Sequence, residues 1–150
     1  MNNALRYQAH AHWTIHKRGI LEADEIPRTI NFAAPPEFGG EPGLWTPEHL
    51  LLGSVITCYV STFRASAEKS KLEFPGLEVF AEGVVQKQEG GLRFAEIVLR
   101  PVITLASEED RERAQRLVEK AERICLVSRS LSCKVSVRAE LKTGELVAAR

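Results

Sequence analysis

The stretch TPEHLLLGSVITCYVSTF, residues 46–63, decides the fold of this chain. Thr46 is suited to cap a helix, Pro47 to occupy its first position, and Glu48 to complement the partial positive charge at its start. The residues that follow are apolar nearly all the way round a helical wheel, which predicts a buried helix rather than an amphipathic one. We expect the helix to continue to Lys71, a length of about 37 Å.

Extended segments lie on both sides of this helix. Residues 5–15 alternate between apolar and polar side chains, with the period of two that a half-buried strand shows. The expected elements, in order, are strands at 5–15, 20–26 and 28–33, a helix at 47–71, strands at 77–87 and 92–105, a helix from Ser107, and a strand at 133–141. This order predicts an α+β fold in a single domain spanning residues 1–150, with antiparallel sheets packed on two core helices.

The second helix is predicted from its cap and its apolar stripe. Ser107 precedes three acidic residues, an arrangement typical of a helix start. Apolar side chains then recur at helical spacing and define one buried face: Ala114, Leu117, Val118, Ala121 and Cys125. We expect the helix to break or restart around residues 128–132. In the preceding strand, Pro101 predicts an edge or a bulge, because proline donates no ladder hydrogen bond.

Composition excludes several classes of protein. The chain has 150 residues, 44% hydrophobic and 27% charged, and its 20 basic residues balance 20 acidic ones. This balance argues against a dedicated nucleic-acid binder or a membrane-surface protein, which are usually basic. The N-terminus lacks the apolar core of a secretory signal, and no apolar run reaches the ~18 residues of a membrane span. We therefore expect a cytoplasmic protein with no nucleic-acid or membrane partner.

The three cysteines are the remaining candidates for a chemical role. Cys58 lies in the middle of the first helix and Cys125 at the end of the second helix's apolar stripe, so two packed helices can bring them together. Each can equally be a small buried hydrophobe, the commonest fate of a free cysteine. Cys133 begins an alternating strand with no motif around it, and we interpret it as structural.

Two sequence motifs surround the first two cysteines. The tripeptide TPE at 46–48 is followed, ten residues after its glutamate, by Cys58 in a helix of small and apolar residues. The second motif, KAERICLVSRSL at 120–131, places Cys125 at a helix end before a small-residue turn with Val-Ser. In both motifs and in the order of its elements, the chain resembles the OsmC/Ohr family, the osmotically inducible and organic-hydroperoxide-resistance proteins. It departs from the family pattern at Leu126, where proline is usual.

The resemblance implies a cysteine-based peroxidase that reduces organic hydroperoxides and hydrogen peroxide. It makes Cys58 the peroxidatic cysteine, which becomes a sulfenic acid, and Cys125 the resolving cysteine, which forms a Cys58–Cys125 disulfide. An external dithiol then restores both thiols, and no organic cofactor or metal is bound. Since only a thiolate attacks peroxide efficiently, a cation is expected near Cys58. The resemblance points to Arg18, with Arg28 as the alternative, and to Glu48 as the carboxylate that orients the guanidinium.

The spacing between Glu48 and Cys58 bears on the assembly. Ten residues of helix separate them by about 15 Å, too far for the two side chains to meet on one straight helix. If Glu48 serves Cys58, either an arginine bridges the distance or the glutamate comes from a second copy of the chain. The second option agrees with the intertwined homodimers that the resemblance implies, and with an apolar helix that one small domain would struggle to cover. We therefore predict a homodimer with two composite sites.

A second function remains open from the sequence. The chain can be a catalytically weak relative that serves as a redox sensor or binds a small apolar ligand, and Leu126 and the choice between two arginines leave that alternative open. A pocket for the tail of a peroxide, or for such a ligand, can draw on apolar side chains near the first helix. These candidates, which can equally be core residues, are Phe38, Leu44, Trp45 and Phe63.

Histidines offer a third, metal-based interpretation. His10 and His12 lie about 6.8 Å apart on one strand face, a spacing that metal sites use. His49 lies beside Glu48 in the first helical turn. No third ligand is tied to either position by the sequence, so we predict no metal site.

Overall fold

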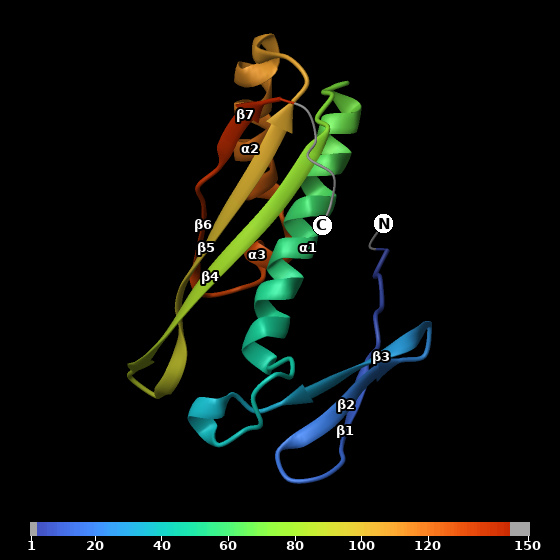
Figure 1. Cartoon of the computed structure of the whole chain (residues 1–150), viewed down its shortest axis with the longest axis vertical. Coiled ribbons are helices and arrows are strands. Elements are labelled where there is room, and N and C mark those ends of the chain that lie inside the picture. The colour runs from blue at the N-terminus through green and yellow to red at the C-terminus, as the bar shows by residue number, and fades with distance from the viewer. Residues whose placement is uncertain (1–2, 145–150) are drawn as a thin grey trace. The chain divides into compact units, whose positions relative to one another are not determined.

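The computed structural model describes residues 3–144 of the chain. The chain divides into two compact units, Met1–Leu51 and Leu52–Arg150, and Figure 1 shows a separate sheet in each. The first unit holds a small antiparallel sheet, and the second holds a larger sheet together with helices. The predicted α+β fold is therefore confirmed.

The sheet of the first unit is antiparallel in the order β1-β2-β3. Its elements are β1 (His10–Trp13), β2 (Arg18–Ala23), β3 (Ile26–Ala33) and the 3-10 turn η1 (Pro36–Phe38). The predicted strand at 5–15 is shorter in the structure, because β1 begins at His10, opposite Glu22 near the end of β2. In the first turn, His16 adopts a positive φ of 52°.

The sheet of the second unit is centred on its longest strand. Its strands are β4 (Gly76–Gln88), β5 (Gly91–Leu105), β6 (Lys134–Val137) and β7 (Glu140–Thr143). The predicted hairpin of β4 and β5 is confirmed. Gly90 and Gly91 lie at its turn with φ values of 91° and 120°, a conformation that glycine adopts at little cost.

β6 and β7 both run parallel to β5, so this sheet is mixed. The sequence predicted antiparallel pairing instead. A parallel pair needs a long crossover connection, which the helical segment between β5 and β6 supplies. The predicted strand at 133–141 is divided between β6 and β7. At the division, the Arg138 N–H donates a hydrogen bond of 2.8 Å to the Leu99 carbonyl.

Pro101 lies where the parallel partner of β5 changes. β6 pairs with residues 96–99 and β7 with residues 102–105, so Pro101 falls between the two ladders. A residue without an N–H interrupts neither ladder at this point. The predicted edge or bulge at Pro101 is therefore wrong, and the irregularity in the β4–β5 pairing lies instead between Val84 and Val85.

The helices follow the sequence closely at their starts. Their bounds are α1 (Pro47–Lys69), η2 (Glu108–Asp110), α2 (Arg111–Ile124) and α3 (Leu126–Arg129). The predicted cap is confirmed, because the Ser107 hydroxyl accepts a hydrogen bond of 3.3 Å from the Glu109 N–H. All members of the predicted apolar stripe of α2 are buried.

α1 is only partly buried within this chain, in contrast to the prediction of a helix buried all round. Val55, Tyr59 and Phe63 recur every four residues and are fully buried, while most of the other side chains are half-buried or exposed. By length and composition, α1 is also the one helix of the described part of the chain that is long and apolar enough to cross a membrane. Its buried face gives it the character of a core helix.

The core of the second unit lies between the sheet and the helices, and Figure 1 shows α1 and α2 on the same face of that sheet. The Phe63 ring contacts the rings of Tyr59 and Phe74, with centroid distances of 6.4 and 5.3 Å. From the sheet, Leu99 and Ile103 of β5 are fully buried. This packed core holds the helix that carries Cys58.

We expect Leu99→Ala to lower the free energy of unfolding by about 2–5 kcal/mol, because it leaves a cavity in this core. The matched control is Leu92→Ala in the same strand, whose side chain is 57% exposed. This control should change the free energy by less than about 0.5 kcal/mol. Urea denaturation followed by circular dichroism measures both, and equal effects would contradict the assigned core.

Candidate active site

The site is built around a break between two helices. α2 ends at Ile124, and Cys125 leaves helical geometry with φ −59° and ψ 114° before α3 begins at Leu126. The predicted break around residues 128–132 therefore occurs earlier, at the cysteine itself. Cys125 is both the C-cap of α2 and the N-cap of α3, so its position is fixed by both helices.

The Cys58 thiol of α1 faces this break. It is half-buried and is hydrogen-bonded to the Cys125 thiol and to the backbone N–H groups of Val127 and Leu126. The Thr62 hydroxyl, one helical turn further along α1, lies 4.0 Å from the Cys58 sulfur. The structure therefore brings the two predicted thiols into direct contact.

These donors decide how readily Cys58 ionises. Burial raises the pKa of the Cys58 thiol, but the backbone N–H of Val127, the Cys125 thiol, the Thr62 hydroxyl and the Leu126 N–H all lower it. The net result is a pKa below the ordinary value of a cysteine thiol. Cys58 therefore carries a larger thiolate fraction at neutral pH than a free cysteine does.

Cys125 has the opposite character. Burial raises the pKa of its thiol, hydrogen bonds from the Ser128 hydroxyl and backbone lower it, and the interaction with Cys58 raises it again. The net result is a pKa above the ordinary value, and the side chain is 1% exposed. Cys125 therefore remains a protonated thiol that can donate its hydrogen to the Cys58 sulfur.

A buried tyrosine holds the two helices of the site together. The Tyr59 hydroxyl donates a hydrogen bond of 3.4 Å to the Val118 carbonyl of α2. Burial raises the pKa of Tyr59, and the charges of Glu122 and Cys125 raise it further. Tyr59 thus stays neutral and fixes the α1 segment that carries Cys58 against α2.

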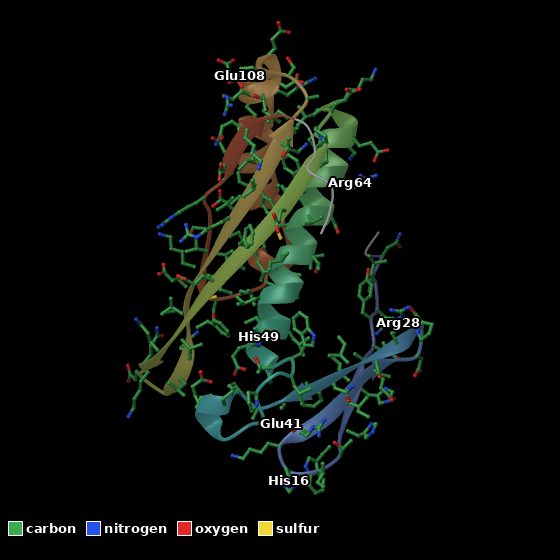
Figure 2. All side chains as sticks on the ribbon, in the orientation of Figure 1. His16, Arg28, Glu41, His49, Arg64 and Glu108 are labelled. Carbon is green, nitrogen blue, oxygen red and sulfur yellow. The ribbon has the colours of Figure 1, made fainter. Side chains whose placement is uncertain are left out.

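The predicted cation and its carboxylate belong to the first unit. Arg18 starts β2 and forms an ion pair with Glu41, with Nε 3.3 Å from the carboxylate. This differs from the expectation that Glu48 orients it. Glu48 lies in the first turn of α1, and its Oε2 is buried with no hydrogen-bond partner in the part of the chain that the structure describes. Arg28 is exposed on β3, and Figure 2 shows it at the end of the first unit's sheet away from Glu41.

The candidates for an apolar pocket separate into two groups. Phe63 is fully buried and packs in the core of the second unit, so it is a core residue. Phe38 and Trp45 are about half-exposed in the first unit, where Leu44 and Trp45 line a shallow surface pocket with His49. The structure therefore does not gather these four side chains into one pocket within either unit.

The histidines have ordinary local partners. His49 Nδ1 lies 2.7 Å from the Thr46 hydroxyl, which also accepts the His49 N–H as the helix cap. His10 Nε2 lies 2.7 Å from a carboxylate oxygen of Glu22 on the neighbouring strand. Across residues 3–144, no three His, Cys, Asp or Glu side chains are grouped so that they could hold a metal ion.

Sequence analysis missed the groups that surround the two thiols. Thr62 follows Cys58 by four residues, a spacing that places both on one helix face, and this signal was available. Leu126, Val127 and Ser128 lie in the second motif, but the part played by their backbone N–H groups depends on where α2 ends. Helix ends are the least predictable features of a sequence.

Comparison with known proteins places this site in a family. A model of OsmC-like proteins matches residues 40–140, which include both thiols. The chain belongs to the OsmC-like family. The family resemblance predicted from the sequence is therefore confirmed.

Individual relatives of this OsmC-like protein match most of the length of the chain. It is 35% identical over 126 residues to the uncharacterized protein YmaD of Bacillus subtilis (strain 168), covering 81% of this chain and 82% of YmaD. It is 27% identical over 133 residues to an organic hydroperoxide resistance protein of Xanthomonas axonopodis pv. citri (strain 306), covering 87% and 91%. A solved OsmC-like protein of unknown function from Vibrio cholerae O1 biovar eltor shares the fold, with a TM-score of 0.81 at 17% identity over 91% of this chain and 100% of that one.

We expect Thr62→Val to raise the pKa of Cys58, because it removes a hydroxyl that faces the sulfur. Alkylation of Cys58 by iodoacetamide at neutral pH should slow by about three-fold, as loss of one modest hydrogen bond predicts. Peptide-resolved mass spectrometry measures the rate. The control, Thr57→Val, alters an exposed hydroxyl of α1 that bonds the Gly53 carbonyl and should leave the rate unchanged. Equal rates in all three proteins would show that Thr62 does not act on Cys58.

Proposed function

We propose that this OsmC-like protein is a thiol-dependent peroxidase that reduces organic hydroperoxides, and hydrogen peroxide as well. The observation that carries the proposal is the hydrogen-bonded pair of Cys58 and Cys125, in which the pKa of one thiol is lowered and that of the other raised. A peroxidatic thiol must be ionised and a resolving thiol must wait nearby in its protonated form. The opposite pKa shifts of the pair support both conditions.

The first step is attack by the Cys58 thiolate on the terminal oxygen of the hydroperoxide. A sulfur–oxygen bond forms, the O–O bond breaks, and the alkoxide leaves and takes a proton to become the alcohol. Cys58 is oxidised to a sulfenic acid and the peroxide is reduced. Because the Cys58 side chain is half-buried, a substrate has to reach it from the side that α1 leaves uncovered.

In the second step, the Cys125 sulfur attacks the sulfenic acid. A Cys58–Cys125 disulfide forms, and the hydroxyl leaves as water with the proton of the Cys125 thiol. This step needs the two Cα atoms within about 7 Å. The hydrogen bond between the two thiols supports their approach. The resting geometry therefore favours resolution within one chain.

The third step is reduction of the disulfide by an external dithiol. Its two thiols become a disulfide and return their hydrogens to Cys58 and Cys125. The cycle uses no bound cofactor or metal. We expect it to run in the cytoplasm, where thiols are kept reduced.

The proposed cycle also includes residues of the first unit. Arg18, or Arg28 in its place, supplies the positive charge beside the peroxide, and Glu48 orients the guanidinium. The buried, unpaired Glu48 carboxylate oxygen supports this role, because such an oxygen is costly without a partner. Within one chain Arg18 pairs with Glu41, so completing the site requires Arg18 to exchange partners or a second copy to contribute.

A homodimer is the assembly that we propose. Apolar side chains of the first unit are strongly exposed in one chain, among them Leu5, Tyr7 and Trp13, each above 70%. α1 likewise leaves much of its apolar surface uncovered. Exposed apolar surface of this kind marks contacts between proteins, and a second copy of the chain supplies a matching surface.

The peroxidase proposal predicts distinct outcomes for the three cysteines. With cumene hydroperoxide and dithiothreitol, Cys58→Ser should reduce turnover to the uncatalysed rate. Cys125→Ser should react once and stop as a sulfenic acid, detectable with dimedone. Cys133→Ser is the control and should keep wild-type activity, because Cys133 is not part of the pair.

The same assay distinguishes a peroxidase from the alternative, a redox sensor or a protein that binds a small apolar ligand. Loss of two thiols with one equivalent of peroxide, without sustained turnover, would indicate a redox sensor. Retention of both thiols would indicate a ligand-binding protein. Full activity of Cys58→Ser would overturn the assigned nucleophile.

We expect a light-scattering mass about twice the 16.7 kDa of one chain. Trp13→Glu places a charge on exposed apolar surface and should shift the protein towards monomer, with loss of peroxidase activity. The control is His12→Glu, an exposed position on the opposite face of β1. A wild-type monomer with full activity would exclude the composite site.

A further inference from the structure

The Tyr59 hydroxyl ties the helix that carries Cys58 to the helix that ends at Cys125. It donates a hydrogen bond of 3.4 Å to the Val118 carbonyl of α2, and the Tyr59 side chain is fully buried. The Phe63 ring stacks with the Tyr59 ring at an interplanar angle of 17°, so packing also restricts the direction of the phenol. The hydroxyl is therefore a fixed point between α1 and α2.

The two ends of this hydrogen bond are linked to the two thiols along the chain. Tyr59 directly follows Cys58 on α1. Val118 precedes Cys125 by seven residues, which is about two helical turns, and both belong to the buried stripe of α2. A slide of α1 along α2 by one turn, about 5 Å, would break the bond and move Cys58 away from Cys125. The bond thus fixes the register in which the thiols meet.

We propose that Tyr59 is a positioning residue for the resolving step, because its bond to Val118 holds α1 and α2 in the register that keeps Cys125 within reach of Cys58. The catalytic meaning rests on the proposed function, whereas the register itself does not depend on peroxide. In the step that Tyr59 serves, the Cys125 sulfur attacks the Cys58 sulfenic acid, a disulfide bond forms, and water leaves with the Cys125 proton. The earlier attack on peroxide takes place at Cys58 alone.

A second contact holds the same pair of helices at the other end. The Arg113 guanidinium of α2 donates a hydrogen bond of 2.9 Å to the Ser70 carbonyl, just beyond the end of α1. Eleven residues separate Ser70 from Tyr59, about 16 Å along a helix. The helices therefore stay together when the Tyr59 hydroxyl is removed, and the register loosens beside the thiols.

Tyr59→Phe tests this role without leaving a buried group unpaired. The variant keeps the ring and its stacking on Phe63, and it removes the hydroxyl alone. The Val118 carbonyl lies inside α2, where it also accepts the N–H of Glu122, so it keeps a partner.

Ser61→Ala is the matched control. The Ser61 hydroxyl also donates to a backbone carbonyl, that of Thr57 at 2.9 Å, but both residues belong to α1. Its removal deletes a bond of the same kind that does not join the two helices.

The first measurement is the equilibrium constant for formation of the Cys58–Cys125 disulfide in a buffer of oxidised and reduced dithiothreitol. Oxidised dithiothreitol takes up the two hydrogens of the thiols, so no peroxide is involved. We expect Tyr59→Phe to lower the constant about five-fold, as loss of one modest hydrogen bond predicts. Ser61→Ala should match wild type. Mass spectrometry after alkylation of the free thiols measures the oxidised fraction.

The second measurement follows the resolving step itself. After one equivalent of cumene hydroperoxide, dimedone added at intervals traps the Cys58 sulfenic acid. Its lifetime should increase about five-fold in Tyr59→Phe, while consumption of that equivalent of peroxide should keep its wild-type rate. A general loss of stability would not separate these two steps.

A wild-type equilibrium constant in Tyr59→Phe would overturn the inference, and so would an equal decrease in Ser61→Ala. Failure of the proposed peroxidase function looks different, because the constant then still falls in Tyr59→Phe while no protein consumes cumene hydroperoxide. Circular dichroism establishes that each variant is folded.

A third measurement needs no variant. The Tyr59–Val118 bond has to persist when the disulfide forms, so the carbon NMR shift of Tyr59 Cζ should be the same in the reduced and oxidised protein. A change that reports loss of the hydrogen bond on oxidation would overturn the inference even where Tyr59→Phe fails to fold.

Discussion

The Cys58 sulfur is the point where α1, the end of α2 and the start of α3 meet. The interruption of the helix at Cys125 makes this meeting possible. In a continuous helix, the N–H groups of Leu126 and Val127 would bond carbonyls four residues earlier. The extended ψ of Cys125 releases them. Hydrogen bonds that a longer helix would use internally are thus available to a sulfur on another element.

The packing of α1 determines which side chain reaches that break. Tyr59 is fully buried and bonded to the Val118 carbonyl, so its direction around α1 is fixed. The preceding residue projects about 100° round the helix, which turns Cys58 away from the core centre and towards the α2–α3 junction. Alanines at 114 and 121 on the apolar stripe of α2 are fully buried in the same core. The core therefore positions the thiol, although it makes no chemical contribution itself.

Much of this arrangement could be predicted from local sequence, and the remainder depends on contacts that sequence does not encode locally. The cap at Thr46 and the buried stripe of α2 followed from residue type and period, whereas the pairing of Cys58 with Cys125 was implied by the family resemblance. The parallel pairing of β6 and β7 did not, because alternation marks a strand without fixing its direction. The roles of the N–H groups at 126 and 127 were also hidden, since their importance depends on one dihedral angle of Cys125.

The two thiols differ in ionisation because burial dominates at Cys125 and raises its pKa, whereas hydrogen bonds outweigh burial at Cys58 and lower its pKa; the contact between the two thiols adds to both shifts. The Cys125 hydrogen stabilises a negative Cys58 sulfur, and that negative charge in turn makes ionisation of Cys125 harder. Two neighbouring thiolates would repel each other in a partly buried site, so ionisation of one thiol disfavours ionisation of the other. Hydrogen bonds from the Val127 and Leu126 N–H groups favour the negative charge on Cys58, and burial disfavours it on Cys125.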